Sequence, residues 1–351
     1  MKLNFCTLFN SNYLSRGLVM YESLLKHCDE FNLYVFAFDD KCYNFLKSQN
    51  YKCLTVISLK EFEDIELLKI KPTRTAVEYC WTCTSSTILY AIKTFGLDHC
   101  TYIDADLCFY QNPYILIKEM GSKSVLITEH RYTKSYDQST DSGKYCVQFV
   151  SFKNDSQGMK VLQWWREACI EWCYARVEDG KFGDQKYLDS WTSNFEGVHE
   201  LKHLGGGIAP WNFQQYFFVL DKEKLKGIEI KSQQKFDAIF FHFHGLKFFD
   251  GDIVSLSSSL YELNENVKTM FYKTYINSLN STKEIIKSID SSLNSNGIMG
   301  KSPMKPMSMG LVLKFYFYDL KKSFRNILGR NLKQRIKHHY FYDIQDFKSL
   351  N

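Results

Sequence analysis

At residues 101–107 the chain reads Thr101-Tyr102-Ile103-Asp104-Ala105-Asp106-Leu107, a short apolar stretch that ends in two carboxylates separated by one small residue. In an extended chain, residues two apart point to the same side, roughly 6–7 Å from each other. Two acids placed in this way repel each other unless a positive charge lies between them. Carboxylate oxygens suit Mg²⁺ and Mn²⁺, which keep coordination sites open for phosphate oxygens. The pattern predicts a divalent metal site, with a polar turn after a strand as the alternative.

The apolar residues before Asp104 are expected to form one strand in a regular alternation of strands and helices. Further strands are predicted at residues 3–9, 33–38, 54–57, 125–128, 145–152 and 236–244, and helices at 13–27, 41–48, 76–95, 158–174 and 262–290. We expect Gly96 to end the helix at 76–95. Such alternation implies crossover connections and a largely parallel sheet with helices on both faces, an α/β fold. Acids that follow a strand lie where these sheets bind ligands.

The charge of the chain is concentrated near its end. The net charge of the 351 residues is +5, and residues 301–351 contain eleven Lys/Arg against three Asp, which leaves −3 for residues 1–300. Basic and aromatic side chains alternate over residues 311–342. This pattern indicates either an amphipathic segment on an anionic membrane surface or a helix docked on its own core with a solvated basic face. No nucleic-acid partner is expected, because no recognition motif accompanies the charge.

The eleven cysteines indicate a reducing compartment, since their number is odd and their spacing is not that of a secreted domain. Cys80-x-x-Cys83 has no matching second pair, so a structural zinc is not expected. The first ten residues lack a signal-peptide core, and no apolar stretch reaches the ~18 residues that a membrane span needs. A cytoplasmic location is expected, with contact to the inner face of the membrane through the basic tail.

A second cluster lies at residues 239–247, Ile-Phe-Phe-His-Phe-His-Gly-Leu-Lys. Alternation places His242 and His244 on one face of a strand that is otherwise apolar. One imidazole can complete a metal site begun by the two acids, while Gly245 and Lys247 offer an N–H and an ammonium to a diphosphate. Two structural histidines are the alternative.

Two further segments carry polar or glycine-rich patterns. Asp184 and Gln185 open a short helix, either as an ordinary N-cap or beside a reacting sugar. The glycines in residues 203–212 let a ligand approach the backbone closely, and Trp211 offers a flat face for a sugar ring. A flexible loop is the competing explanation for that second segment.

In this order and spacing the motifs resemble glycosyltransferases of the GT-A fold, family 8 in particular, over residues 2–249. The resemblance implies a Rossmann-like α/β fold with a mixed, mostly parallel sheet and a helical C-terminal extension. Asp104 and Asp106 match the family's metal-binding Asp-x-Asp. The run from His242 to Lys247 is similar to its His-x-x-Gly-x-x-Lys motif, one residue shorter before the lysine. Either His242 or His244 is then the third metal ligand, and His242 is favoured.

The resemblance extends to the nucleotide and the sugar. Asn10-Ser11-Asn12-Tyr13 occupies the place of the family's uridine-binding Asp-x-x-Tyr turn, with Thr7 just upstream. Asp184-Gln185 looks like the family's Asp-Gln, and residues 145–154 resemble the strand before it, without the usual Asn-Ser-Gly. Arg74, with Glu78, is a candidate donor contact, the alternative being a surface ion pair at i,i+4.

The resemblance implies transfer from a nucleotide sugar, a UDP-hexose, to a saccharide or lipid-linked acceptor, with Mn²⁺ or Mg²⁺ and with retention of configuration. The metal and Lys247 would neutralise the charge that grows on the departing diphosphate, and Asp184 or Gln185 would steady the sugar. The implied organisation is a GT-A catalytic domain at 1–250, a helical extension and linker at 251–300, and a basic tail at 301–351. A nucleotidyltransferase acting on sugar phosphates and a non-catalytic carbohydrate-binding protein are the other function classes.

Overall fold

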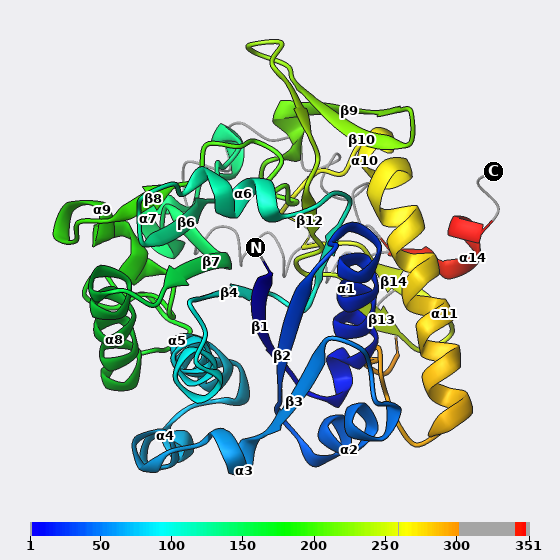
Figure 1. Ribbon diagram of the computed structural model, residues 1–351. Helices are drawn as coiled ribbons and strands as arrows, with labels where there is room; N and C mark the ends of the chain where they lie inside the picture. Colours follow the sequence, from blue (N-terminus) through cyan, green and yellow to red (C-terminus); the bar gives the residue numbers. More distant parts are fainter. Residues whose placement is uncertain (1, 259, 302–340, 349–351) are drawn as a thin grey trace.

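A computed structural model describes residues 2–258, 260–301 and 341–348. The centre of the molecule is a seven-stranded sheet (Figure 1). Its strands are, along the chain, β1 (Leu3–Phe9), β2 (Phe31–Ala37), β3 (Leu54–Ser58), β4 (His99–Ile103), β6 (Val125–Glu129), β7 (Tyr145–Lys153) and β8 (Val198–Glu200). In space the order is β3-β2-β1-β4-β7-β6-β8. β7 pairs antiparallel with both β4 and β6, and the other pairs are parallel. The predicted mixed, mostly parallel sheet is confirmed.

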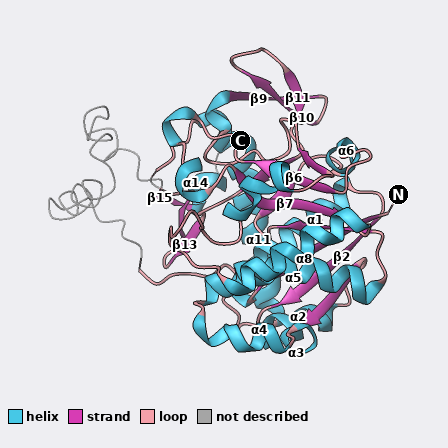
Figure 2. Cartoon of the chain, turned by 90° about the vertical axis from the view of Figure 1, so that its left-hand side faces the viewer, coloured by secondary structure: helices cyan, strands magenta, loops and turns pink. Residues whose placement is uncertain are grey.

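Helices cover both faces of this sheet, as the alternation predicted. Phe5 of β1 packs with α1 (Leu14–His27) and α2 (Asp40–Gln49). The next residue, Cys6, packs on the opposite face with α5 (Ala76–Phe95) and α8 (Ser156–Glu171), both labelled in Figure 2. Because both faces are covered, all seven side chains of β1 are buried. This is why the parallel strands appear in the sequence as continuous apolar runs.

Local signals fix the ends of α5. The Thr75 and Glu78 side chains exchange hydrogen bonds with each other's backbone N–H in a capping box. Gly96 ends the helix in the left-handed conformation, with φ of 60°, as predicted. The shorter helical elements are η1 (Ser11–Tyr13), α3 (Leu59–Phe62), α4 (Ile65–Ile70), η2 (Lys71–Thr73), α6 (Tyr114–Glu119), η3 (Lys134–Tyr136), α7 (Ser139–Ser142), η4 (Lys186–Ser190), α9 (Trp191–Asn194) and η5 (Phe213–Gln215).

The predicted strand at residues 236–244 is instead divided between two sheets. β11 (Lys235–Asp237) closes a three-stranded sheet with β10 (Lys224–Glu229) and β9 (Tyr216–Asp221), whereas β12 (Phe240–His242) pairs with β5 (Leu107–Phe109). Between them the chain changes partner, because the Ile239 and Phe240 N–H groups both donate to the Gly205 carbonyl oxygen. Only glycine fits at 205, where a Cβ would overlap the Asp237 carbonyl oxygen.

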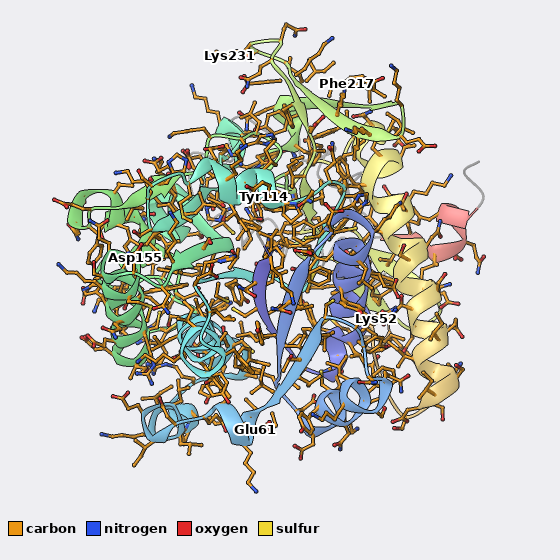
Figure 3. The ribbon with its side chains drawn as sticks, viewed as in Figure 1. Lys52, Glu61, Tyr114, Asp155, Phe217 and Lys231 are labelled. Carbon is orange, nitrogen blue, oxygen red and sulfur yellow. The ribbon has the colours of Figure 1, made fainter. Side chains whose placement is uncertain are left out.

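The β9–β10 ribbon projects from the body of the molecule. At the top of Figure 3, the labelled Phe217 and Lys231 point away from the core. Phe217 is about half exposed, whereas its neighbour Phe218 packs inward on Phe271. The Asn266 side chain donates to the Phe218 carbonyl and accepts from its N–H, so this strand edge is partly covered.

Past residue 245 the chain adds to a third apolar core, which also contains Phe218 and Phe241. The predicted helix at 262–290 begins later, with α10 (Glu265–Val267), and passes through a π-helical turn at Lys268–Tyr272 into α11 (Lys273–Ile289), which packs against α1. The remaining elements are β13 (Lys247–Phe249), β14 (Ile253–Ser255), β15 (Phe341–Asp343) and α14 (Ile344–Lys348).

Most of the predicted basic segment at 311–342 lies outside the described residues, and the domain boundaries at 250 and 300 stay predictions. Within the part of the chain that the structure describes, we find no helix with the length and apolar character needed to cross a bilayer. All eleven cysteines are free thiols.

Candidate active site

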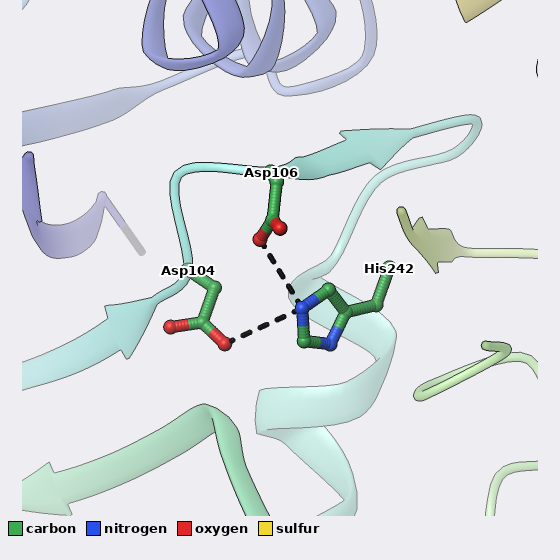
Figure 4. Close-up of side chains that lie close together, drawn as sticks. All are labelled: Asp104, Asp106 and His242. Atoms are coloured by element: carbon green, nitrogen blue, oxygen red, sulfur yellow. Dashed lines mark ion pairs between the residues drawn. The ribbon is translucent and has the colours of Figure 1, made fainter. Parts of the chain in front are cut away.

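Asp104 and Asp106 are presented by the tight turn that joins β4 to β5. The Leu107 N–H closes this turn by donating to the Asp104 carbonyl oxygen at 3.3 Å. The sequence pattern predicted an extended chain here, but the structure has a turn. Both carboxylates nevertheless face the same imidazole, that of His242 (Figure 4).

The pairing of β5 with β12 explains how a residue so distant in sequence arrives beside the two acids. The two strands are antiparallel, and Leu107 lies opposite His242. The next residue, Phe243, donates its N–H to the Asp106 carbonyl oxygen at 3.0 Å. This register places the imidazole over the turn that carries the carboxylates.

The three side chains form a compact group of candidate metal ligands. His242 Nε2 lies 3.1 Å from Asp106 Oδ1 and 3.7 Å from Asp104 Oδ2. One ligand atom from each residue lies within 4.8 Å of the others. His244, the other predicted ligand, is not in this group; its ring centroid lies 5.5 Å from that of His242, and it lines the same cavity.

The charges in this group depend on one another. Burial and the Asp106 carboxylate raise the pKa of Asp104, against the effect of His242. Burial would also raise the pKa of Asp106, but the charge and hydrogen bond of His242 outweigh it and lower that pKa. The two acids in turn raise the pKa of His242 against its burial. A protonated imidazole therefore balances the carboxylates, and a divalent cation can take the place of that proton, since its oxygen and nitrogen ligands are already gathered.

A cavity of about 610 Å³ surrounds these three residues. Asn10 and Tyr13 line it where the chain leaves β1, and Asp184 and Gln185 line it from the segment before η4. Gln185 Nε2 donates to the Ser142 carbonyl oxygen at 2.6 Å. Candidate ligand, nucleotide and sugar residues thus share one space.

Gly245 and Lys247 line a smaller neighbouring cavity of about 300 Å³. Tyr13 lines both cavities and so connects them. The buried Arg16 guanidinium donates to the Leu246 and Asn296 carbonyl oxygens, at 3.0 Å each, and so holds the chain on both sides of this cavity.

Two predicted donor contacts do not line either cavity. Thr7 lies inside β1 and is fully buried. Arg74 stacks on Tyr174, with its guanidinium carbon 3.9 Å from the ring centroid, and donates to the Ile170 carbonyl oxygen. Glu78 caps α5 and accepts from the Ala175 N–H. Roles of Thr7 and Arg74 in donor binding stay predictions.

The glycine-rich segment is held in place by hydrogen bonds. Arg131 donates to the carbonyl oxygens of His203 and Gly206, and the Trp211 indole N–H donates to the His130 carbonyl oxygen at 2.9 Å. Trp211 is only 3% exposed, and its ring packs nearly at right angles to that of His242. Trp211 therefore packs against the candidate ligand His242 instead of presenting an open ring face to a sugar.

Asp184 is buried in the cavity wall. Trp165 donates its indole N–H to the Asp184 carbonyl oxygen at 2.9 Å. Burial raises the pKa of the Asp184 carboxyl to about 7, and the Asp104 charge adds to this, while hydrogen bonds from Thr84 and from the backbone oppose it. Near neutral pH this side chain can hold or release a proton.

Asp184→Asn is expected to stabilise the metal-free protein at pH 8 and to have little effect at pH 4. The folded pKa of about 7 lies above the ordinary value of 3.8, so the folded state binds more protons between these values and the wild type loses stability as pH rises through them. Each pKa unit corresponds to about 1.4 kcal/mol. Urea unfolding from pH 4 to pH 8 measures the difference; the exposed Asp179→Asn is the control, and equal pH slopes in wild type and Asp184→Asn would contradict the assignment.

Sequence reasoning missed Gln148, whose side chain contacts His242 from β7. The available signal was a single amide in the otherwise apolar run Tyr-Cys-Val-Gln-Phe-Val at 145–150.

Comparison with solved structures finds similarity to glycosyltransferases. The galactosyltransferase LgtC, solved with donor and acceptor sugar analogs, is 10% identical, with a TM-score of 0.48 over 80% of this chain and 96% of LgtC. GlyE of Streptococcus pneumoniae TIGR4 is 12% identical, with a TM-score of 0.43 over 88% of this chain and 67% of GlyE. Mouse xyloside xylosyltransferase 1 is 12% identical, with a TM-score of 0.37 over 57% of this chain and 85% of that enzyme.

No family model matches the chain. Two uncharacterized proteins of Bacillus subtilis (strain 168) are similar in sequence. YfnD is 32% identical over 217 residues, which cover 61% of this chain and 70% of YfnD. YfnF is 30% identical over 274 residues, 76% of this chain and 86% of YfnF. At this identity and coverage, the chain belongs to the family that contains YfnD and YfnF.

Proposed function

We propose that the protein is a metal-dependent glycosyltransferase that moves a sugar, a hexose carried by UDP, to a saccharide or lipid-linked acceptor with retention of configuration. The observation that supports this most directly is the convergence of Asp104, Asp106 and His242 in one cavity. Asn10 and Tyr13 line this cavity and are proposed to bind the nucleotide, and Asp184 and Gln185 line it and are proposed to contact the sugar.

The proposed reaction exchanges one bond at the anomeric carbon of the sugar, and the metal ligands and Lys247 each have a role in it. The bond from this carbon to the diphosphate oxygen breaks and the nucleotide leaves with the electron pair. The acceptor hydroxyl oxygen forms the new bond, and its proton passes to the departing diphosphate oxygen. A bound Mn²⁺ or Mg²⁺ would neutralise the negative charge on the departing diphosphate. Asp104, Asp106 and His242, the favoured third ligand, would hold the ion, and Lys247, which lines the neighbouring cavity, would add a positive charge for the diphosphate.

Asp184 and Gln185 are proposed to steady the sugar as positive charge develops on its ring. Asp184 lines the cavity, and its carboxylate, the form that prevails above its pKa of about 7, would stabilise this charge. Gln185 is anchored through its amide to the Ser142 carbonyl, so its oxygen is held in a defined place.

The two rival classes make different demands on this site. A nucleotidyltransferase would usually need a glycine-rich loop after the first strand, but residues 7–13 contain no glycine, and a 3-10 turn capped by Asn10 follows β1. A non-catalytic sugar-binding protein would bind saccharide without releasing UDP from any UDP-sugar. An anionic membrane surface is proposed as a further partner of residues 311–342. If the full chain and a variant with the basic side chains of this segment neutralised sediment equally with anionic liposomes, the membrane proposal is wrong.

Calorimetric titration with UDP, with and without Mn²⁺, tests the proposal. We expect UDP to bind at least ten times more tightly with Mn²⁺, because the ion bridges the carboxylates and the diphosphate. A panel of UDP-, GDP- and dTDP-sugars, scored for metal-dependent release of the nucleotide, then identifies the donor. Tight UDP binding that ignores Mn²⁺, or release of pyrophosphate from a nucleoside triphosphate and a sugar phosphate, would contradict the proposal.

A further inference from the structure

Gln148 contacts two of the three candidate metal ligands from the middle of β7. Its side chain is fully buried, and its Oε1 lies 2.8 Å from His242 Nδ1. Its backbone carbonyl oxygen accepts the Asp104 N–H at 3.1 Å. One residue of the central sheet therefore touches both the histidine and the turn that carries the acids.

The chemistry of the amide oxygen decides which nitrogen of His242 carries a proton. An amide oxygen only accepts hydrogen bonds, so Nδ1 must donate to it. In the neutral ring the lone pair then lies on Nε2, the nitrogen that faces Asp104 and Asp106. This is the tautomer that a metal ion in this position needs, and contacts of this kind commonly orient metal-binding histidines.

The neighbourhood of Gln148 preserves this arrangement. Trp211 packs on the His242 ring, with centroids 5.3 Å apart at 86°, and so limits rotation of the imidazole. The Gln148 Nε2 is buried and finds no hydrogen-bond partner among residues 2–258, 260–301 and 341–348. A Cβ at Gly207 would lie 3.0 Å from this nitrogen, so glycine leaves room for the amide. Burying an unpaired amide costs stability, and a purely structural site would be better filled by an apolar side chain.

We propose that Gln148 is a positioning residue, which holds His242 in the Nδ1–H tautomer with Nε2 directed at the metal site and fixes the Asp104 turn through its carbonyl group. The inference rests on the metal site of the proposed function and not on sugar transfer. Because the amide is uncharged, it orients the imidazole without adding a third negative charge beside the two acids.

The test compares Gln148→Leu with wild type in the full-length chain without donor. Leucine keeps a similar volume and removes only the hydrogen-bonding groups. We expect the affinity for Mn²⁺, measured by calorimetry, to fall about 10- to 100-fold. The control is Gln111→Leu, a half-buried glutamine outside both cavities, which should change the affinity less than threefold. Gln148→Glu keeps an acceptor opposite Nδ1 and should bind Mn²⁺ more tightly than Gln148→Leu.

A second measurement separates positioning from a general loss of structure. Long-range ¹H–¹⁵N spectra of histidine-labelled protein with Mg²⁺ should show a single Nδ1–H tautomer for His242 in wild type and a mixture in Gln148→Leu, at an unchanged urea midpoint. Unchanged Mn²⁺ affinity in a folded Gln148→Leu overturns the inference and leaves the proposed function standing. If wild type binds no Mn²⁺, the proposed metal dependence fails, and the inference about Gln148 fails with it because it rests on that metal site.

Discussion

Asp106→Asn is expected to lower metal-dependent release of UDP from its sugar donor by about 10²- to 10³-fold, the usual cost of losing one group that stabilises charge in a transition state. Asp106 is the carboxylate nearest to His242 Nε2, at 3.1 Å, and its side chain is only 14% exposed. Asparagine keeps the volume of the side chain but removes its charge, so the loss falls on metal binding and not on packing. Coupled detection of UDP at saturating donor and a range of Mn²⁺ concentrations measures the effect.

The rate as a function of Mn²⁺ concentration shows whether this loss comes from weaker binding of the metal. If Asp106 binds the ion, the variant needs far more Mn²⁺ for half-maximal rate, and its UDP affinity without metal stays that of wild type. Asp179→Asn, an exposed acid on the loop before Asp184, should behave like wild type. If Asp106→Asn is fully active at the Mn²⁺ concentration that wild type needs, Asp106 does not bind the metal, and the site on which the proposed function depends is wrong.

Trp165→Ala is expected to lower the free energy of unfolding by about 3–5 kcal/mol, as large-to-small substitutions of aromatic core residues do. The Trp165 side chain is fully buried, with ring centroids 6.1 Å from Phe152 and 5.3 Å from Trp191. Alanine would leave a cavity between α8 and the sheet and would remove the hydrogen bond to the Asp184 carbonyl oxygen. Urea unfolding followed by circular dichroism measures the change.

The adjacent tryptophan provides a matched control. Trp164 is only partly buried and packs on Tyr187 and Phe195 at the rim of the same core. Trp164→Ala should therefore cost clearly less than Trp165→Ala. Trp165→Phe keeps most of the apolar volume, and we expect a loss of about 1 kcal/mol from the missing hydrogen bond. Equal losses for the two alanine variants would show that the core is not centred on Trp165.

The elements that the sequence predicted best are those whose signals are local. The strand at 3–9 and the helix at 76–95 have the predicted ends, because apolar runs, a capping box and Gly96 act over a few residues. The strand predicted at 236–244 failed because its partners, Gly205 and β5, are remote in the sequence. Apolar pattern alone does not say with which strand a segment pairs.

The candidate site shows the same division. Asp104, Asp106 and His242 carry chemistry that is visible in their residue types, and the structure brings them together. Gln148 was missed because its side chain contacts His242 on β12, a strand of another sheet, and nothing in the sequence around residue 148 marks that contact. The neighbouring cavity depends on Asn296, brought against α1 through Arg16, which no local pattern predicts.

Because Leu107 pairs with His242, the three candidate metal ligands can come together only after residue 242 has been synthesised. On a ribosome, the strands of residues 3–103 can associate while the two acids still lack their imidazole. An ion that binds only the completed group would stabilise the finished chain by mass action, by about 2.7 kcal/mol at a concentration one hundred times its dissociation constant. Metal supply during synthesis would then influence how much protein reaches its mature form, apart from any influence on turnover.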